Sequence, residues 1–294
     1  MMPAMVFALP GNEAMAESLA RALDAELGLM ETRSFPDGET YLRIASNPAG
    51  RSVALICTLH RPDDKFLRLA FAAETIKQMD ASSVGLVAPY LSYMRQDRRF
   101  APGEALTSAT FARILSPLID WLVTVDPHLH RYQSLGEIYT IPAYSLHAAP
   151  LLAGWIRTHV RDPLLIGPDV ESEQWVSEVA TSVGAPHQVL RKTRRGDRNV
   201  DIEVPDLRSF SDRTPVLIDD IVSTGRTMVE TAHRLAGQGL CAPVCIAVHA
   251  LFSEAAFQEL NATASTVVTT NSVPHSSNGI DVTGLIVKAL RSLR

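Results

Sequence analysis

Two carboxylates, three hydroxyl side chains and a glycine follow an apolar segment in the second half of the chain. Residues 216–218 read as a buried strand, and Asp219 and Asp220 come directly after it. Carboxylates at a strand end can accept hydrogen bonds from vicinal sugar hydroxyls or hold a magnesium ion. The next residues form a turn and open a helix, whose N–H groups, hydroxyls and dipole can bind a phosphate: Ser223, Thr224, Gly225, Arg226 and Thr227. Any one of them alone fits an ordinary helix cap, whereas the complete ordered run favours a sugar-phosphate site.

An aromatic residue and two acids surround a turn near the N-terminus, in the segment Phe35-Pro36-Asp37-Gly38-Glu39. Phe35 can stack on a purine, and Asp37 and Glu39 can accept hydrogen bonds from an exocyclic amine. The alternative is a plain Pro-Asp-Gly turn before a strand at residues 40–44.

Planar basic and amide side chains are concentrated in the run Pro89-Tyr90-Leu91-Ser92-Tyr93-Met94-Arg95-Gln96-Asp97-Arg98 and in Arg99, which follows it. The forks of Arg95, Gln96, Arg98 and Arg99 suit a polyphosphate. A solvated basic loop is the alternative interpretation.

His128 and His130 stand two residues apart just after an apolar segment at residues 122–125. A lone histidine is more often structural than catalytic. Magnesium prefers oxygen ligands, so the chemistry of imidazole favours contact with phosphate over coordination of that metal.

Five basic residues are concentrated in residues 191–198: Arg191, Lys192, Arg194, Arg195 and Arg198. Such a cluster is usually a solvated face, and nucleic-acid binding is a second interpretation. No aromatic residue interleaves the cluster and the whole chain is acidic, which argues against RNA binding.

The 216–227 run closely resembles the phosphoribosyl diphosphate-binding motif of two families, the type I phosphoribosyltransferases and ribose-phosphate pyrophosphokinase. Three segments of the first half resemble only the second family: residues 35–39, residues 89–98 and Asp126-Pro127-His128. They stand in that family's order and spacing, so the resemblance covers nearly the whole chain.

The resemblance implies a Mg²⁺-dependent enzyme that transfers the diphosphoryl group of ATP to the C1 hydroxyl of ribose 5-phosphate. It implies seven ATP contacts: Phe35, Asp37, Glu39, Arg95, Gln96, Asp97 and Arg98. It implies seven ribose 5-phosphate contacts: Asp219, Asp220, Ser223, Thr224, Gly225, Arg226 and Thr227. Catalytic roles are implied for Lys192, Arg194 and His128. Metal binding is implied for His128 and Asp169, with His130 as a further candidate. A homo-oligomer built from dimers is also implied, with a hexamer among the assemblies it allows.

One loop departs from this family. After the segment at residues 164–166, the family carries Pro-Asp-x-Gly-Gly, whereas this chain reads Pro168-Asp169-Val170-Glu171-Ser172-Glu173 with no glycine. Side chains in place of glycines limit how closely the backbone can approach a ligand, and the two glutamates repel an unshielded phosphate. This loop leaves open a non-catalytic relative that binds nucleotide or sugar phosphate. A phosphoribosyltransferase is a second alternative, and the extra ATP-like first half argues against it.

Short apolar segments alternate with helical patterns along the chain, which predicts an α/β fold with mostly parallel sheets covered on both faces. Strands are expected at residues 5–9, 53–57, 84–88, 122–125, 164–166, 216–218, 244–248 and 266–269. Helices are expected at residues 13–26, 64–79, 108–118, 145–158, 173–183 and 227–237. Together with the resemblance, this predicts two tandem phosphoribosyltransferase-like domains: an ATP-binding domain at residues 1–143 and a ribose 5-phosphate-binding domain at 144–280. The helix at 281–294 is expected to pack back on the first domain.

The composition excludes several classes of function. A net charge of −5 argues against bulk attraction to nucleic acid or an anionic membrane. No apolar run approaches the roughly 18 residues of a transmembrane helix, and no signal peptide is expected. Three cysteines without Cys-x-x-Cys spacing suggest neither a disulfide framework nor a zinc site, so a reducing, cytoplasmic location is expected.

Overall fold

Two compact units make up the chain. The computed structural model describes residues 2–99, 101–168, 172–195 and 199–293. Unit 1 is Met1–Leu146 with Thr283–Arg294, and unit 2 is His147–Val282. Each unit is built on a six-stranded sheet whose neighbouring strands are all parallel, flanked by helices. The prediction of two tandem α/β domains with mostly parallel sheets is confirmed.

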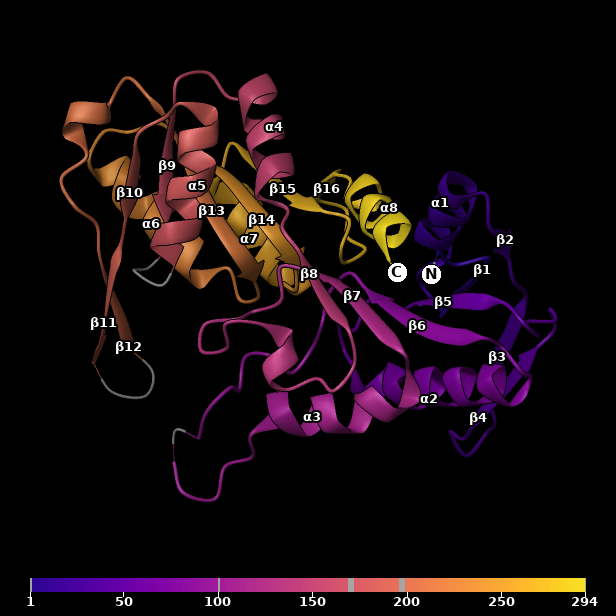
Figure 1. Ribbon diagram of the computed structural model, residues 1–294. Helices are drawn as coiled ribbons and strands as arrows, with labels where there is room; N and C mark the ends of the chain where they lie inside the picture. Colours follow the sequence, from indigo (N-terminus) through magenta and orange to yellow (C-terminus); the bar gives the residue numbers. More distant parts are fainter. Residues whose placement is uncertain (1, 100, 169–171, 196–198, 294) are drawn as a thin grey trace. The chain divides into compact units, whose positions relative to one another are not determined.

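The sheet of unit 1 has helices on both faces. Its elements are β1 (Met5–Ala8), α1 (Glu13–Leu23), β2 (Glu26–Leu27), β3 (Met30–Ser34), β4 (Thr40–Ile44), β5 (Ser52–Ile56), α2 (Asp63–Gln78), β6 (Ser83–Ala88), α3 (Thr107–Leu115), β7 (Trp121–Val125), β8 (Ala143–Leu146) and α8 (Thr283–Ser292). The strand order is β2-β1-β5-β6-β7-β8, and β3 and β4 form a separate antiparallel hairpin. Figure 1 shows α1 and α8 on one face of the sheet and α2 and α3 on the other. The C-terminal helix is tied to α1 by Arg291 Nη2, which donates to the Ala22 carbonyl at 2.7 Å.

Unit 2 repeats this plan. Its elements are α4 (Ala149–His159), β9 (Pro163–Gly167), α5 (Glu173–Val183), β10 (His187–Val189), β11 (Arg191–Arg195), β12 (Asn199–Glu203), β13 (Thr214–Val222), α6 (Arg226–Gly237), β14 (Val244–Ala250), α7 (Glu254–Thr263), β15 (Thr266–Thr270) and β16 (Asn278–Ile280). The sheet has the order β10-β9-β13-β14-β15-β16, while β11 and β12 form a separate antiparallel hairpin. The strand order reverses between β9 and β13, which is where parallel sheets open a crevice for ligands.

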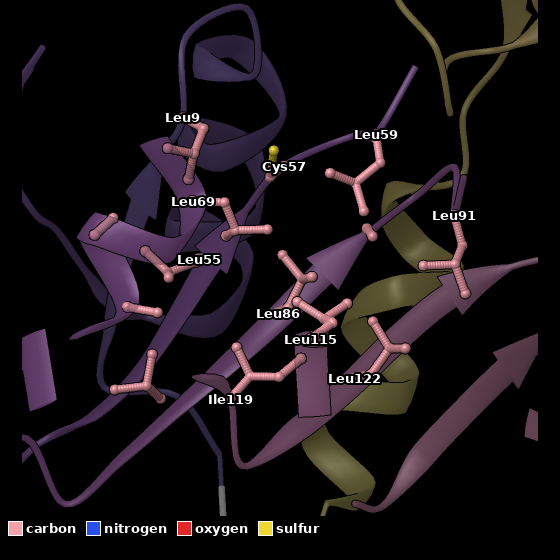
Figure 2. Packing of buried hydrophobic residues seen from close by; sticks show 14 of the residues in the cluster. Leu9, Leu55, Cys57, Leu59, Leu69, Leu86, Leu91, Leu115, Ile119 and Leu122 are labelled. Carbon is pink, nitrogen blue, oxygen red and sulfur yellow. The ribbon is translucent and has the colours of Figure 1, made fainter. Parts of the chain in front are cut away.

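Apolar side chains fill the space between the sheet of unit 1 and its helices. Every residue of β5 and β7 is buried, as expected for strands covered on both faces. Figure 2 shows Leu55, Leu86 and Leu122 of adjacent strands in one cluster with Leu69 of α2 and Leu115 of α3. This core holds the carboxyl ends of the strands, and the loops that follow them, in a fixed arrangement.

Gly85 in β6 lies directly across from Trp121 in β7. A Cβ atom at Gly85 would meet the indole ring at 1.8 Å, so Gly85→Ala forces apart two central strands. We expect the variant to lose about 1–3 kcal/mol of unfolding free energy, measured by denaturant titration. The control is Gly154→Ala in α4, where the nearest atom is 3.9 Å away; it should gain about 0.5–1 kcal/mol. Equal stability of the Gly85→Ala variant and the parent would contradict this packing argument.

Three element predictions are corrected at their ends. The helix expected at 145–158 begins only at α4, because Ala143–Leu146 instead pair with β7 as β8. The helix expected at 13–26 ends at Leu23, because Asp24 adopts a left-handed φ of 54°. The helix expected at 108–118 ends at Leu115 and continues as a 3-10 turn containing Pro117.

All three cysteines are free thiols. Burial raises the pKa of Cys57 and of Cys245 to about 12, so both are protonated at neutral pH, whereas Cys241 is exposed. We expect a thiol reagent to label only Cys241 in the native protein and all three cysteines after unfolding. Rapid labelling that persists in Cys241→Ser would contradict this.

Within the described ranges, no helix combines the length and the apolar character needed to cross a membrane.

Candidate functional site

Asp219 and Asp220 lie where β13 extends beyond β9. The pairing with β9 ends at Leu217 opposite Ile166, whereas β13 continues to Val222 alongside β14. Both aspartates are half-buried. Asp219 Oδ1 accepts from the Asp220 N–H at 2.9 Å, and Asp220 Oδ1 accepts from the Ile221 N–H at 2.7 Å. These bonds fix both carboxylates beside the point where the strand order reverses.

The turn after β13 leads directly into the positive end of a helix. Gly225 has a φ of 67°, which a residue with a Cβ adopts only with strain, and it precedes the twelve-residue helix α6. Among the described residues no side chain caps this helix, and its first turn contains no acidic residue. No such group competes with an anion for the first N–H groups. Ser223 and Thr227 are half-buried here, and Thr224 and Arg226 are exposed.

The basic segment predicted as a loop is mostly a hairpin. Lys192 pairs with Ile202 and Arg194 with Val200 across β11 and β12. Leu190 immediately precedes the hairpin, and its N–H donates to the Gly167 carbonyl at 3.0 Å. Because Gly167 ends β9, the hairpin starts from the same edge of the sheet as the two aspartates. Asp169 and Arg198 lie outside the described residues.

Two loops of unit 1 are joined side by side, one after β6 and one after β7. Arg131 Nε contacts Asp97 Oδ1 at 3.3 Å, and the Asp97 side chain is only 7% exposed. Ser108 Oγ donates to the Gln96 carbonyl at 3.1 Å and lies 3.0 Å from the Tyr132 hydroxyl. The structure therefore brings together the segment that carries Arg95, Gln96, Asp97 and Arg98 and the segment that carries His128 and His130.

The imidazole rings of the two histidines are in contact within their loop. The ring centroids of His128 and His130 are 3.8 Å apart and the ring planes are inclined by 77°. His128 is half-buried and His130 is exposed. Asp126 precedes them with a φ of 34°, which marks a sharp bend at the end of β7.

The chain bends at Tyr93, two residues before Arg95, and the sequence pattern did not indicate this bend. Tyr93 has a φ of 62°, and its hydroxyl donates to the Asp63 carboxylate at the start of α2. Burial, together with this hydrogen bond, raises the pKa of Tyr93 to about 12, so the hydroxyl keeps its proton at neutral pH. Asp63, Arg131 and Tyr132 thus join the site as supports, although no local motif distinguished them.

Phe35, Asp37 and Glu39 lie elsewhere in unit 1. They occupy the turn between β3 and β4, where Gly38 N–H donates to the Phe35 carbonyl at 2.9 Å and Glu39 N–H donates to Asp37 Oδ1 at 3.2 Å. All three side chains are exposed. In Figure 1 this turn and the loop after β6 lie on opposite sides of the unit. The structure does not bring the two predicted groups of nucleotide contacts together within one chain.

Comparisons with known proteins agree over both units. Residues 4–118 match the model of the N-terminal domain of ribose phosphate pyrophosphokinase, and residues 134–283 match the phosphoribosyl transferase domain. The ribose-phosphate pyrophosphokinase of Methanopyrus kandleri is 32% identical over 98% of this chain and 99% of its own length. That of Methanosarcina acetivorans is 32% identical over 97% of this chain and 98% of its own length.

A solved structure supports the fold. The phosphoribosylpyrophosphate synthetase from Mycobacterium smegmatis superimposes with a TM-score of 0.86 at 24% identity, covering 98% of this chain and 97% of its own. With both domain models and near-complete relatives in agreement, the chain is an enzyme that belongs to the ribose-phosphate pyrophosphokinase family.

Proposed function

We propose that this enzyme transfers the diphosphoryl group of ATP to the C1 hydroxyl of ribose 5-phosphate, which yields phosphoribosyl pyrophosphate and AMP. The observation that carries the proposal is the junction of β13 and α6. Two fixed carboxylates there precede a left-handed glycine and an uncapped helix start in the described part of unit 2. Such a site suits a ligand that carries vicinal hydroxyls at one end and a phosphate at the other.

Unit 2 would bind the sugar phosphate. Asp219 and Asp220 would accept hydrogen bonds from the ribose hydroxyls. The 5-phosphate would lie against the turn and the first helical N–H groups, with contacts from Ser223, Thr224, Gly225, Arg226 and Thr227. This orientation leaves the C1 hydroxyl free to attack.

Unit 1 would bind the nucleotide. Phe35 would stack on the base, and Asp37 and Glu39 would accept from its exocyclic amine. Four residues after β6 would contact or position the polyphosphate: Arg95, Gln96, Asp97 and Arg98. Because the Asp97 carboxylate contacts Arg131, the proposed role of Asp97 is to hold the loop after β6 in place.

Transfer needs no side-chain nucleophile. The oxygen of the C1 hydroxyl attacks the β-phosphorus in line and forms a bond to it, and the hydroxyl proton passes to solvent. The bond between the β-phosphorus and the oxygen that bridges it to the α-phosphate breaks as AMP leaves. Lys192, Arg194 and His128 would stabilise the charge on the transferring group, as in phosphoryl transfer generally.

Magnesium fits part of the donor set. Carboxylate oxygens are the ligands it prefers, and Asp219 and Asp220 present two half-buried carboxylates in the part of β13 that extends beyond β9. His128 and Asp169, with His130 as a further candidate, are the other proposed metal contacts, although imidazole suits magnesium less well. Bound Mg²⁺ would neutralise phosphate charge and draw electrons from the phosphorus.

The nucleotide site requires two chains if both groups of contacts are used. The turn between β3 and β4, which carries Phe35, and the loop after β6, which carries Arg95, lie on opposite sides of unit 1. In a shared site, one subunit would supply the Phe35 turn and a second subunit would supply the Arg95 loop. The proposed assembly is therefore a homo-oligomer built from dimers, with a hexamer as one form. At ATP concentrations far below the KM of either variant, Phe35→Ala and Arg95→Ala alone should turn over very slowly. Subunit exchange between them should restore about one quarter of parental activity at the same ATP concentration, because half the dimers are mixed and each has one intact site. No recovery in verified mixed dimers would contradict the shared site.

The decisive assay contains purified protein, Mg²⁺, ATP and ribose 5-phosphate, and follows AMP. The proposal predicts AMP in proportion to phosphoribosyl pyrophosphate with no base added. A phosphoribosyltransferase would instead consume phosphoribosyl pyrophosphate and a base. A non-catalytic relative would bind ligands without turnover. Absence of AMP under these conditions would overturn the proposal.

A reducing cytoplasm is the proposed location, and the three free thiols support it.

A further inference from the structure

A cation fills the corner between two aromatic rings on the β3–β4 hairpin. The guanidinium carbon of Arg33 lies 4.5 Å from the ring centroid of Phe35 and 4.3 Å from that of Tyr41. The two ring centroids are 6.2 Å apart with planes inclined by 89°. Arg33 therefore covers one face of each ring, which is the arrangement of a double cation–π contact.

Strand geometry produces this group. Arg33 pairs directly with Tyr41 across the hairpin, and Phe35 is two residues along from Arg33, so all three share one face. The backbone is fixed by the Phe35 N–H, which donates to the Glu39 carbonyl at 2.7 Å. Ser34, on the other face, accepts from Arg68 Nη2 of α2 at 2.9 Å. The hairpin thus holds its main chain without help from Arg33.

An acid on the same face, Glu31, already has a basic partner. Glu31 is paired with Arg43 at 2.9 Å, directly across the hairpin. Among the described residues, the contacts of the Arg33 cation are with rings and not with a carboxylate. Its position is therefore set by Phe35 and Tyr41.

Phe35 is 39% exposed although Arg33 covers one of its faces. Arg33 leaves the opposite face of the ring uncovered, and we expect a planar ligand to stack there. A ring that is held in place loses less conformational freedom when the ligand binds than a ring that rotates freely.

We propose that Arg33 is a positioning residue of the nucleotide site: it holds the Phe35 ring in the orientation that stacks on a purine. This inference rests on the proposed role of Phe35 as the base contact. It predicts that loss of the guanidinium weakens nucleotide binding and leaves the sugar-phosphate site and the chemical step unchanged.

The test compares Arg33→Met and Arg33→Lys with Arg43→Met, a control on the same face of the same hairpin. KM for ATP, KM for ribose 5-phosphate and kcat are measured for each. Arg33→Met should raise KM for ATP about three- to tenfold with the other two constants unchanged. Arg33→Lys, which keeps the charge but not the planar fork, should be intermediate. Arg43→Met should match the parent.

A double-mutant cycle with Phe35→Ala separates the possible failures. If Arg33 acts through Phe35, Arg33→Met has no further effect on KM for ATP in the Phe35→Ala background. If Phe35→Ala raises this KM and Arg33→Met does not, only the role of Arg33 is wrong. The role of Arg33 is also wrong if Arg33→Met changes kcat or KM for ribose 5-phosphate as much as it changes KM for ATP. If Phe35→Ala leaves KM for ATP unchanged, the proposed role of Phe35 is wrong, and the inference about Arg33 is overturned with it.

Discussion

Lys192→Ala should lower kcat for AMP formation by about 100- to 1,000-fold, with KM values for ATP and ribose 5-phosphate changed by about twofold at most. The physical reason is that negative charge on the transferring group changes most in the transition state. A cation placed there stabilises that state more than the bound substrates. Lys192 lies in β11, on a hairpin that directly follows Leu190, and Leu190 is bonded to the end of β9. The hairpin therefore belongs to the same sheet edge as Asp219 and Asp220.

Steady-state rates at saturating substrates give this measurement, and Arg195→Ala is the matched control. Arg195 belongs to the same strand, and Arg195→Ala removes one positive charge as Lys192→Ala does, but no catalytic role is assigned to Arg195. Arg194→Ala should resemble Lys192→Ala, and the double variant should lose less than the product of the two effects, because both cations stabilise one group. If Lys192→Ala turns over like the parent, or if Arg195→Ala loses as much activity, the proposed role of the hairpin is wrong.

Asp220→Asn should weaken the binding of ribose 5-phosphate about 10- to 100-fold and leave ATP affinity nearly unchanged. Hydrogen bonds to a charged group contribute about 1.5–3 kcal/mol, which sets this range. Asparagine keeps the carbonyl oxygen that can accept from the Ile221 N–H, a bond of 2.7 Å in the parent. The local backbone should survive, and the change falls on the charge presented to the ligand.

Calorimetric titration with each substrate checks this prediction. Asp212→Asn is the control because Asp212 is exposed and lies just before the opposite end of the same strand. It should bind both substrates like the parent. If Asp220→Asn weakens the binding of both substrates equally and leaves the thermal unfolding midpoint unchanged, this would contradict a separate sugar-phosphate site in unit 2.

The strand-to-helix junction of unit 2 could be predicted because its chemistry is local. The apolar segment, the two aspartates, the hydroxyl residues and Gly225 follow one another closely in the sequence. Each favours a strand, a turn or a helix start through interactions with its near neighbours. The one revision is that β13 continues past the aspartates to Val222, since β14 still pairs with it there. That pairing is made by residues far along the chain, which the local pattern does not reveal.

Short edge strands escaped prediction for the same reason. Both β8 and β10 have partly exposed side chains and lack the continuous apolar run of a central strand. They are strands because β7 and β9 supply hydrogen-bond partners. The β11–β12 hairpin is likewise determined by pairing across the turn, so its charged sequence resembled a loop.

By itself, the sequence determined the α/β class, the repeated strand-helix units and the strand-turn-helix order of the β13–α6 junction, because these depend on consecutive residues. Only the tertiary structure decided which distant segments meet. It joined Asp97 to Arg131, stacked Arg33 between Phe35 and Tyr41, and separated the Phe35 turn from the Arg95 loop. Sheet order, strand register and core packing control these contacts, and all three arise from interactions between residues that are remote along the chain.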